Sequence, residues 1–171
     1  MNPIRLTLLA VTLAFAAGPL LAKKPSKTPK KDDEVVEINE NDPAMKAAFK
    51  QAQATLDTFL ATVIPTNPKF GAVAVRIVLH EGKKSEYFWA MPFKVDGEGF
   101  QGAINNVPRV VHTVKYGQEI KFKRADIVDW MYVDSQAKIM HGNFTTCAQL
   151  TKAPPAHAKE MKKVYGLDCE R

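Results

Sequence analysis

The apolar residues between positions 43 and 63 recur at steps of three and four, the spacing of one face of an α-helix. Asn41 or Asp42 can cap such a helix, and Pro43 suits its first turn. Pro65 then prevents its continuation. The pattern predicts one amphipathic helix whose apolar face covers a sheet, formed by Met45, Phe49, Ala52, Leu56, Phe59 and Val63.

After residue 70 the period changes to two, which is typical of β-strands. We expect a strand within each of the runs FGAVAVRIVL, EYFWAMPF, FQGAIN, KYGQEIKFKR, ADIVDWMYVD and AKIMHGNFTT. The fourth and fifth are either separate or one strand bent near Ala125. Pro154 or Pro155 can start a last helix, and Gly166 can stop it.

This order of elements predicts an α+β fold, because parallel strands would need helices between them. One N-terminal helix packs on a curved antiparallel sheet of five to six strands, and a short C-terminal helix follows. We expect a single domain over residues 43–171. Residues 23–42 form a Lys/Pro-rich and then acidic linker, since they hold too little apolar surface to offset the entropy of ordering.

Residues 1–22 have the pattern of a secretory signal peptide, with Arg5 before an apolar run and small residues after it. The run is shorter than the roughly 18 to 20 residues that span a bilayer. We therefore expect cleavage after Ala22, with Ala16 as the other candidate. The mature chain would then be periplasmic or secreted and would have no transmembrane anchor.

The amino-acid composition and motifs limit the classes of partner that this chain is expected to bind. The chain carries 24 Lys and Arg against 18 Asp and Glu, and this excess is scattered, so it indicates an acidic partner only weakly. Gly-rich phosphate loops and dinucleotide fingerprints are absent from the sequence, which argues against nucleotides and other cofactors. Basic residues between aromatic residues suit single-stranded nucleic acid, but an exported chain is not expected to meet it.

Cys147 and Cys169 are the two cysteines. In an oxidising compartment a pair favours a structural disulfide, worth about 3 kcal/mol for a loop of this length, over free thiols or a redox site. The histidines show no metal-binding spacing. A zinc site from His112, His141 and Asp129 would have to assemble from distant segments, so we expect no metal.

Two carboxylates are candidates for catalysis. Strict alternation along IVDWMYV places Ile127 and Asp129 on one aliphatic face, where a carboxylate is either paired or has a raised proton affinity. Arg76 and Arg124 are candidate partners, and capping of backbone N–H groups is the other structural interpretation. Glu86 could join Asp129 in the acid and base pair of a glycosidase, or could be an exposed strand end.

Aromatic side chains are candidates for binding. Trp89, Trp130 and Tyr132 fall on strands that should be neighbours, so they are either core or an exposed platform for sugars or a protein. Asn106 is either a turn residue or a donor and acceptor for a ligand.

Several motifs together resemble the YegJ-like bacterial family, a domain of unknown function (2314). They are NDPAMKAAFKQAQATLDTFL, Glu86 with Trp89, the pattern Gly102-x-Ile104-x-Asn106-x-Pro108, Gly117, and finally IVDWMYVD with GNFT. The resemblance covers about residues 41 to 150. It supports the expected fold and implies no established activity.

Two functions remain as hypotheses. The first is a non-catalytic periplasmic module that binds a protein or another cell-envelope component through its sheet face. The second is a small envelope hydrolase that uses Asp129 with Glu86 or His141, and it requires these groups to meet in a cleft.

Overall fold

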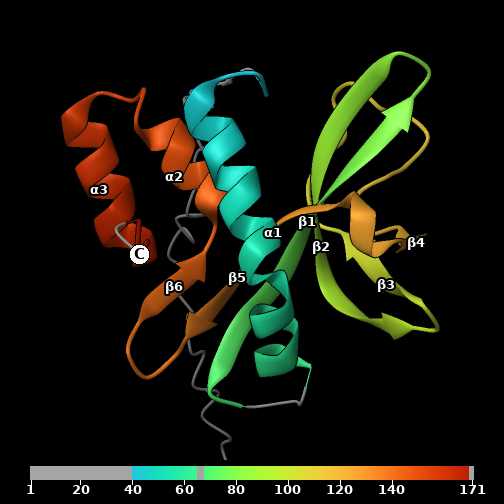
Figure 1. Cartoon of the computed structure of the whole chain (residues 1–171), viewed down its shortest axis with the longest axis horizontal. Coiled ribbons are helices and arrows are strands. Elements are labelled where there is room, and N and C mark those ends of the chain that lie inside the picture. The colour runs from blue at the N-terminus through green and yellow to red at the C-terminus, as the bar shows by residue number, and fades with distance from the viewer. Residues whose placement is uncertain (1–39, 65–67, 170–171) are drawn as a thin grey trace, which may run out of the picture. The chain divides into compact units, whose positions relative to one another are not determined.

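The computed structural model describes residues 40–64 and 68–169, so the expected signal peptide and nearly all of the expected linker lie outside the described residues. Figure 1 shows the helices and strands of the domain. In chain order they are α1 (Pro43–Val63), β1 (Phe70–Glu81), β2 (Lys84–Asp96), β3 (Gly99–Ile104), β4 (Glu119–Phe122), the 3-10 turn η1 (Arg124–Asp126), β5 (Ile127–Asp134), β6 (Ile139–Gly142), α2 (Phe144–Leu150) and α3 (Pro155–Tyr165).

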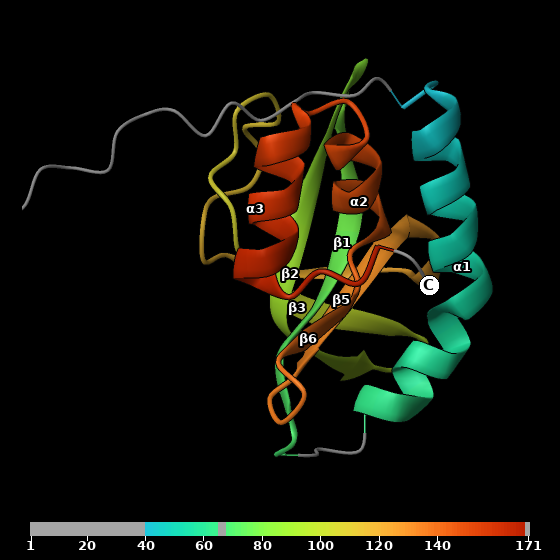
Figure 2. The ribbon, with the colours of Figure 1, turned by 90° about the vertical axis from the view of Figure 1, so that its left-hand side faces the viewer.

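The strands form one antiparallel sheet in the order β4-β3-β2-β1-β5-β6. This confirms the predicted α+β fold. The helix α1 packs along the sheet, and α2 lies between α1 and α3 in both views (Figures 1 and 2).

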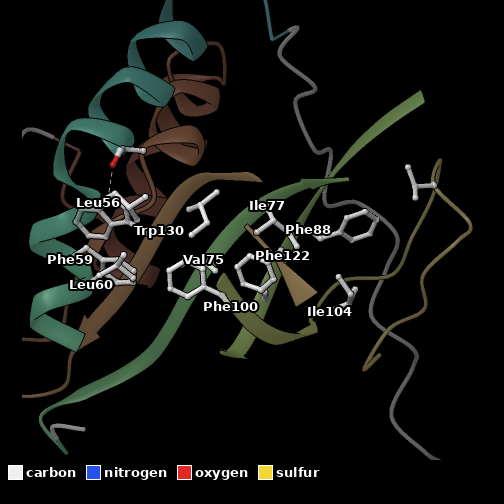
Figure 3. Close-up of a cluster of buried hydrophobic side chains, with 14 residues drawn as sticks. Leu56, Phe59, Leu60, Val75, Ile77, Phe88, Phe100, Ile104, Phe122 and Trp130 are labelled. Atoms are coloured by element: carbon white, nitrogen blue, oxygen red, sulfur yellow. Dashed lines mark hydrogen bonds between the residues drawn. The ribbon is translucent and has the colours of Figure 1, made fainter. Parts of the chain in front are cut away.

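Helix α1 begins and ends where the apolar period predicts. The Asp42 side chain caps it by accepting a hydrogen bond from the backbone N–H of Ala44 at 2.8 Å, and Pro43 occupies the first turn. Its buried face joins residues of every strand from β1 to β5 in one core (Figure 3), whose largest members are Leu56, Phe59, Leu60, Val75, Ile77, Phe88, Phe100, Ile104, Phe122, Ile127 and Trp130.

Trp130 joins α1 to the sheet. Its ring stacks on Phe59 with centroids 4.7 Å apart, and its Nε1–H donates to the Ala52 carbonyl and to Thr55 Oγ1, each at 3.2 Å. The indole is 8% exposed. Its apolar ring is therefore packed in the core, and its one polar group is hydrogen-bonded inside the domain.

Strand β5 contains a β-bulge, so its side chains do not alternate between the two faces of the sheet as the sequence predicts. Arg76 pairs with Asp129, but the next residue, Ile77, pairs with Ile127, so Val128 is an extra residue on β5. Because Arg76 and Ile77 point to opposite faces, Ile127 and Asp129 do as well. The expectation that these two share a face is wrong, since one inserted residue reverses the alternation.

The sixth predicted strand is shorter than expected. Strand β6 ends at Gly142, and Phe144 begins α2, so NFTT belongs to a helix start rather than to a strand. Asn143 makes the transition with a left-handed φ of 57° while its N–H donates to the Trp130 carbonyl at 2.8 Å. The fourth and fifth strands are separate, with η1 between them.

The C-terminal segment covers the outer edge of β6. Leu167 forms a parallel bridge with Met140, and Gly166 ends α3 in the left-handed conformation that the sequence predicts for it. Cys147 and Cys169 are bonded, with Cα atoms 5.5 Å apart, which confirms the expected disulfide. Helix α3 itself has no buried residue, so the bridge and this edge pairing hold it in place.

Candidate functional site

Asp129 is fully buried and all its partners belong to the fold. Its Oδ1 accepts hydrogen bonds from the N–H groups of Trp130 at 2.8 Å and Phe144 at 3.3 Å. Its Oδ2 accepts from Thr145, both from the N–H at 2.8 Å and from the hydroxyl at 2.6 Å. Since Phe144 and Thr145 are the first residues of α2, Asp129 caps this helix from a neighbouring strand.

Arg76 belongs to the same network through Thr145. Its Nη1 donates to Thr145 Oγ1 at 2.7 Å, and its guanidinium lies 5.4 Å from the ring centre of Tyr87 and 5.8 Å from that of Trp89. Arg124, the other candidate partner of Asp129, pairs instead with Asp57 at 2.8 Å. The Thr145 hydroxyl therefore bridges the Asp129 carboxylate and the Arg76 guanidinium, in place of a direct ion pair.

The electrostatics of Asp129 follow from this position. Burial raises the pKa of Asp129, while the hydrogen bonds from Thr145 and Trp130 and the charge of Arg76 act in the opposite direction. A raised pKa marks many catalytic acids, but those groups also face a cleft. With no exposed surface, Asp129 has no route to a substrate.

Glu86 holds the long connection between β3 and β4, which we name the anchored loop (residues 105–118). Its carboxylate accepts hydrogen bonds from three consecutive N–H groups, those of Arg109 at 2.9 and 3.1 Å and of Val110 and Val111 at 2.8 Å. Burial raises the pKa of Glu86, but these N–H groups outweigh it, and the net shift is downward. The carboxylate is a fixed anion that orders the loop.

Asn106 joins the start of the anchored loop to the free edge of β2. Its Oδ1 accepts from the Trp89 N–H at 2.8 Å, its Nδ2 lies 3.5 Å from the Tyr87 carbonyl, and the neighbouring Asn105 N–H donates to the Trp89 carbonyl at 2.8 Å. The side-chain amide thus imitates one residue of an additional strand. Val111 fixes a second point of the anchored loop, because its side chain is fully buried in the core.

This ordered loop exposes three large apolar side chains. Val107 is 69% exposed, Val110 41% and Tyr116 64%. Loops usually carry function when a rigid scaffold positions them, and an ordered loop that presents large apolar side chains to solvent is a candidate binding surface.

His141 and Tyr132 lie in a different place, a groove of about 260 Å³ beside α1. Their rings stack with centroids 4.8 Å apart. The opposite wall is a row of polar side chains on α1, formed by Gln51, Thr55, Thr58 and Thr62. Neither Asp129 nor Glu86 lines this groove, so the three candidate catalytic residues do not meet in it.

The two tryptophans do not form a joint platform. Trp130 pairs with Val75 on one face of the sheet, whereas Trp89 pairs with the adjacent Arg76 on the other. The platform interpretation does not hold, because the twofold period of β1 separates the two rings, and Trp130 lies in the core as the other interpretation expects. Of the four residues proposed for binding, Tyr132 and the largely buried Trp130 line the groove, Trp89 is half-buried beside Arg76, and Asn106 serves the fold.

The histidines are dispersed. His80 contacts Ser85 at 2.8 Å, His112 is in the anchored loop, and His157 is exposed on α3. Over residues 40–64 and 68–169, no three His, Cys, Asp or Glu side chains gather as a metal site. No helix within these ranges is long and apolar enough to cross a membrane.

Sequence reasoning missed the anchored loop. It left residues 107–114, between the expected strand runs FQGAIN and KYGQEIKFKR, without a role. One signal was present: residues 105–118 hold four valines and a tyrosine but no acidic residue, which is unusual for a solvated loop of that length. The row of threonines on α1 was also predictable from the sequence, because Thr55, Thr58 and Thr62 follow one another at steps of three and four and so share one helical face.

Comparison with known proteins places the chain in a family. Residues 42–169 match the family described as "Uncharacterized protein conserved in bacteria (DUF2314)", so the similarity reaches Cys169 rather than ending near residue 150. The chain is 33% identical over 119 residues to "Uncharacterized protein YegJ" of Escherichia coli (strain K12), which covers 70% of this chain and 75% of that protein. No solved structure matches. The chain therefore belongs to the DUF2314 family of bacterial proteins.

Proposed function

We propose that this protein is an exported, non-catalytic module that binds a component of the cell envelope through its anchored loop. The observation that carries the proposal is the use of Glu86: one carboxylate accepts three backbone N–H groups of a loop that exposes the large apolar side chains Val107, Val110 and Tyr116. Ordering a surface before its partner arrives reduces the entropy lost on binding.

Export is part of the proposal because of the N-terminal pattern in residues 1–22 and the disulfide. A bond between Cys147 and Cys169 persists in an oxidising compartment, and it restrains a helix that buries no residue of its own. Both features suit a protein that works outside the cytoplasm.

Hydrolysis by Asp129 with Glu86 or His141 is not supported by the described geometry. Asp129 has no exposed surface, the oxygens of Glu86 are directed at the loop backbone, and His141 lines a groove without either of them. An acid and base pair needs two titratable groups that reach the same substrate. We therefore propose no second function.

Cell fractionation tests the proposal. The full chain is expressed in a bacterial host, and the wild type is compared with the double variant Val107→Ser/Tyr116→Ser. A matched control, Val164→Ser/Tyr165→Ser, alters two side chains of similar exposure on α3. We expect a mature wild type lacking residues 1–22 in the envelope fraction, release of the loop variant into the periplasmic extract, and no change for the control. Retention of the leader, or an equal distribution of all three proteins, would refute the proposal.

A further inference from the structure

The exposed apolar side chains of the anchored loop share one end of the domain with a set of cations. Arg109 and Lys115 belong to the loop itself and are exposed. The turn between β1 and β2 lies beside it, because the Glu81 carboxylate accepts a hydrogen bond from the His112 N–H at 3.1 Å, and this turn carries Lys83 and Lys84 (Figure 1).

Two acidic residues beside the loop, Glu81 and Glu86, are engaged by its backbone. Residues 105–118 contain no Asp or Glu. Glu81 and Glu86 use their carboxylates to accept N–H groups of the loop, so their charges are directed at its backbone. The anchored loop and the adjoining turn therefore expose four cations, Lys83, Lys84, Arg109 and Lys115, and three large apolar side chains, Val107, Val110 and Tyr116.

We propose that this surface docks on an anionic phospholipid bilayer; the inference deepens the proposed function by naming the envelope component. Lysine and arginine side chains pair with anionic headgroups, and tyrosine is favoured at the depth of the headgroups because its ring is apolar and its hydroxyl polar. Valine side chains that project from a rigid loop reach the boundary of the acyl chains without unfolding the loop.

Charge complementarity favours an anionic lipid surface over a sugar or a protein as the partner. The chain as a whole is basic, with a net charge of +6, so an anionic surface attracts the domain from a distance. The exposed side chains of the anchored loop include two cations and no carboxylate, which suits an anionic surface better than a neutral sugar. A protein partner remains an outcome of the test.

The helix α3 supplies an internal control. It also exposes lysines next to apolar side chains, Lys159 and Lys163 beside Val164 and Tyr165, but it includes Glu160 and no carboxylate anchors it. If the basic protein were attracted to an anionic surface only non-specifically, both the anchored loop and α3 would contribute to binding. In specific docking only the anchored loop contributes.

Vesicle co-sedimentation of the purified mature chain tests the inference. Vesicles of phosphatidylglycerol and phosphatidylethanolamine in about equal parts are compared with vesicles of phosphatidylcholine alone. We expect binding to the anionic vesicles only. Arg109→Gln/Lys115→Gln should weaken it roughly 30-fold, the value for two headgroup contacts, and Val107→Ser/Tyr116→Ser about tenfold. The charge-matched control Lys159→Gln/Lys163→Gln should bind within about twofold of the wild type.

Three outcomes overturn the inference: no binding to anionic vesicles, equal loss for the loop and α3 variants, or no loss for either loop variant. All the substituted side chains are exposed, so each variant should fold, and circular dichroism checks this. If vesicles do not bind while loop-dependent envelope association persists in cells, the proposed function stands and the partner is a protein or a glycan. If both fail, the proposed function fails too.

Discussion

Asp129 and Thr145 are joined by two hydrogen bonds to one oxygen: Asp129 Oδ2 accepts from the backbone N–H of Thr145 at 2.8 Å and from its hydroxyl at 2.6 Å. The same hydroxyl oxygen accepts from Arg76 Nη1 at 2.7 Å. A chain of contacts therefore runs from β1 through α2 to β5. It explains how a carboxylate is accommodated without solvent in the interior of a small domain.

The first prediction concerns Asp129→Asn. The amide keeps the shape of the side chain but presents a donor to the Thr145 N–H or hydroxyl, and it leaves Arg76 without its counter-charge. We expect a loss of about 3 kcal/mol in the free energy of unfolding, measured by urea denaturation. Asp57→Asn is the control, because Asp57 forms an exposed ion pair with Arg124 and should change stability by less than about 0.5 kcal/mol.

A catalytic Asp129 would give the reverse pattern. The variant would then keep its stability and lose an activity that the wild type shows. Unaltered unfolding of Asp129→Asn would therefore contradict the structural role.

The second prediction concerns Gly142, which lies against the face of Trp130. A Cβ at Gly142 would stand 2.2 Å from the Trp130 carbonyl oxygen and 2.5 Å from its ring, at a φ of 75°. We expect Gly142→Ala to destabilise the domain by about 3 kcal/mol or more and to shift the emission of Trp130. Gly117→Ala is the matched control, because its φ is 77° but the space around it is open, so only about 1 kcal/mol of backbone strain is expected.

The third prediction concerns the disulfide. Replacing Cys147 and Cys169 by serine removes a cross-link across a sequence separation of 22 residues, which is worth about 3 kcal/mol in the chain-entropy model. Because α3 buries no residue, its backbone amides should also exchange faster with solvent while those of β1 stay protected. An equal loss of protection in α3 and β1 would mean that α3 is integral to the core.

The fourth prediction is a dependence on pH. The folded pKa of Glu86 lies below its ordinary value of 4.5, so its contribution to stability is complete above that pH and is lost as the pH falls through the folded pKa. Glu86→Gln should be less stable than the wild type by roughly 1 kcal/mol at pH 7, and the difference should shrink below pH 4.5. Urea denaturation from pH 3 to 7 measures it. A difference independent of pH would show that the charge of Glu86 does not matter.

The regular elements of the fold were predictable from sequence, because each depends on a local period. The steps of three and four in α1 placed its ends at Pro43 and Val63, and Gly166 marked the end of α3. The alternation of β1 placed Val75 and Ile77 in the core. Local caps and periods act within a few residues, where sequence patterns are informative.

The candidate site was not predictable to the same extent, because it is built from distant contacts. The bulge at Val128 arises from pairing with β1, and no local pattern marks it. Glu86 reaches N–H groups more than twenty residues away, and Asn106 imitates a strand residue only because β2 has a free edge there. Sequence reasoning found Glu86, Asn106 and Asp129 as notable residues and offered backbone capping as one interpretation of Asp129, but it could not identify the N–H groups that the three side chains satisfy.

The most direct test of the central claim, that Glu86 orders a binding loop, is amide hydrogen exchange of residues 109–111 in the wild type and in Glu86→Gln. These three N–H groups should be protected in the wild type and should lose most of that protection in the variant, while the amides of β1 and β5 stay protected. If the three amides exchange as fast in the wild type as in the variant, Glu86 does not order the loop and the account fails.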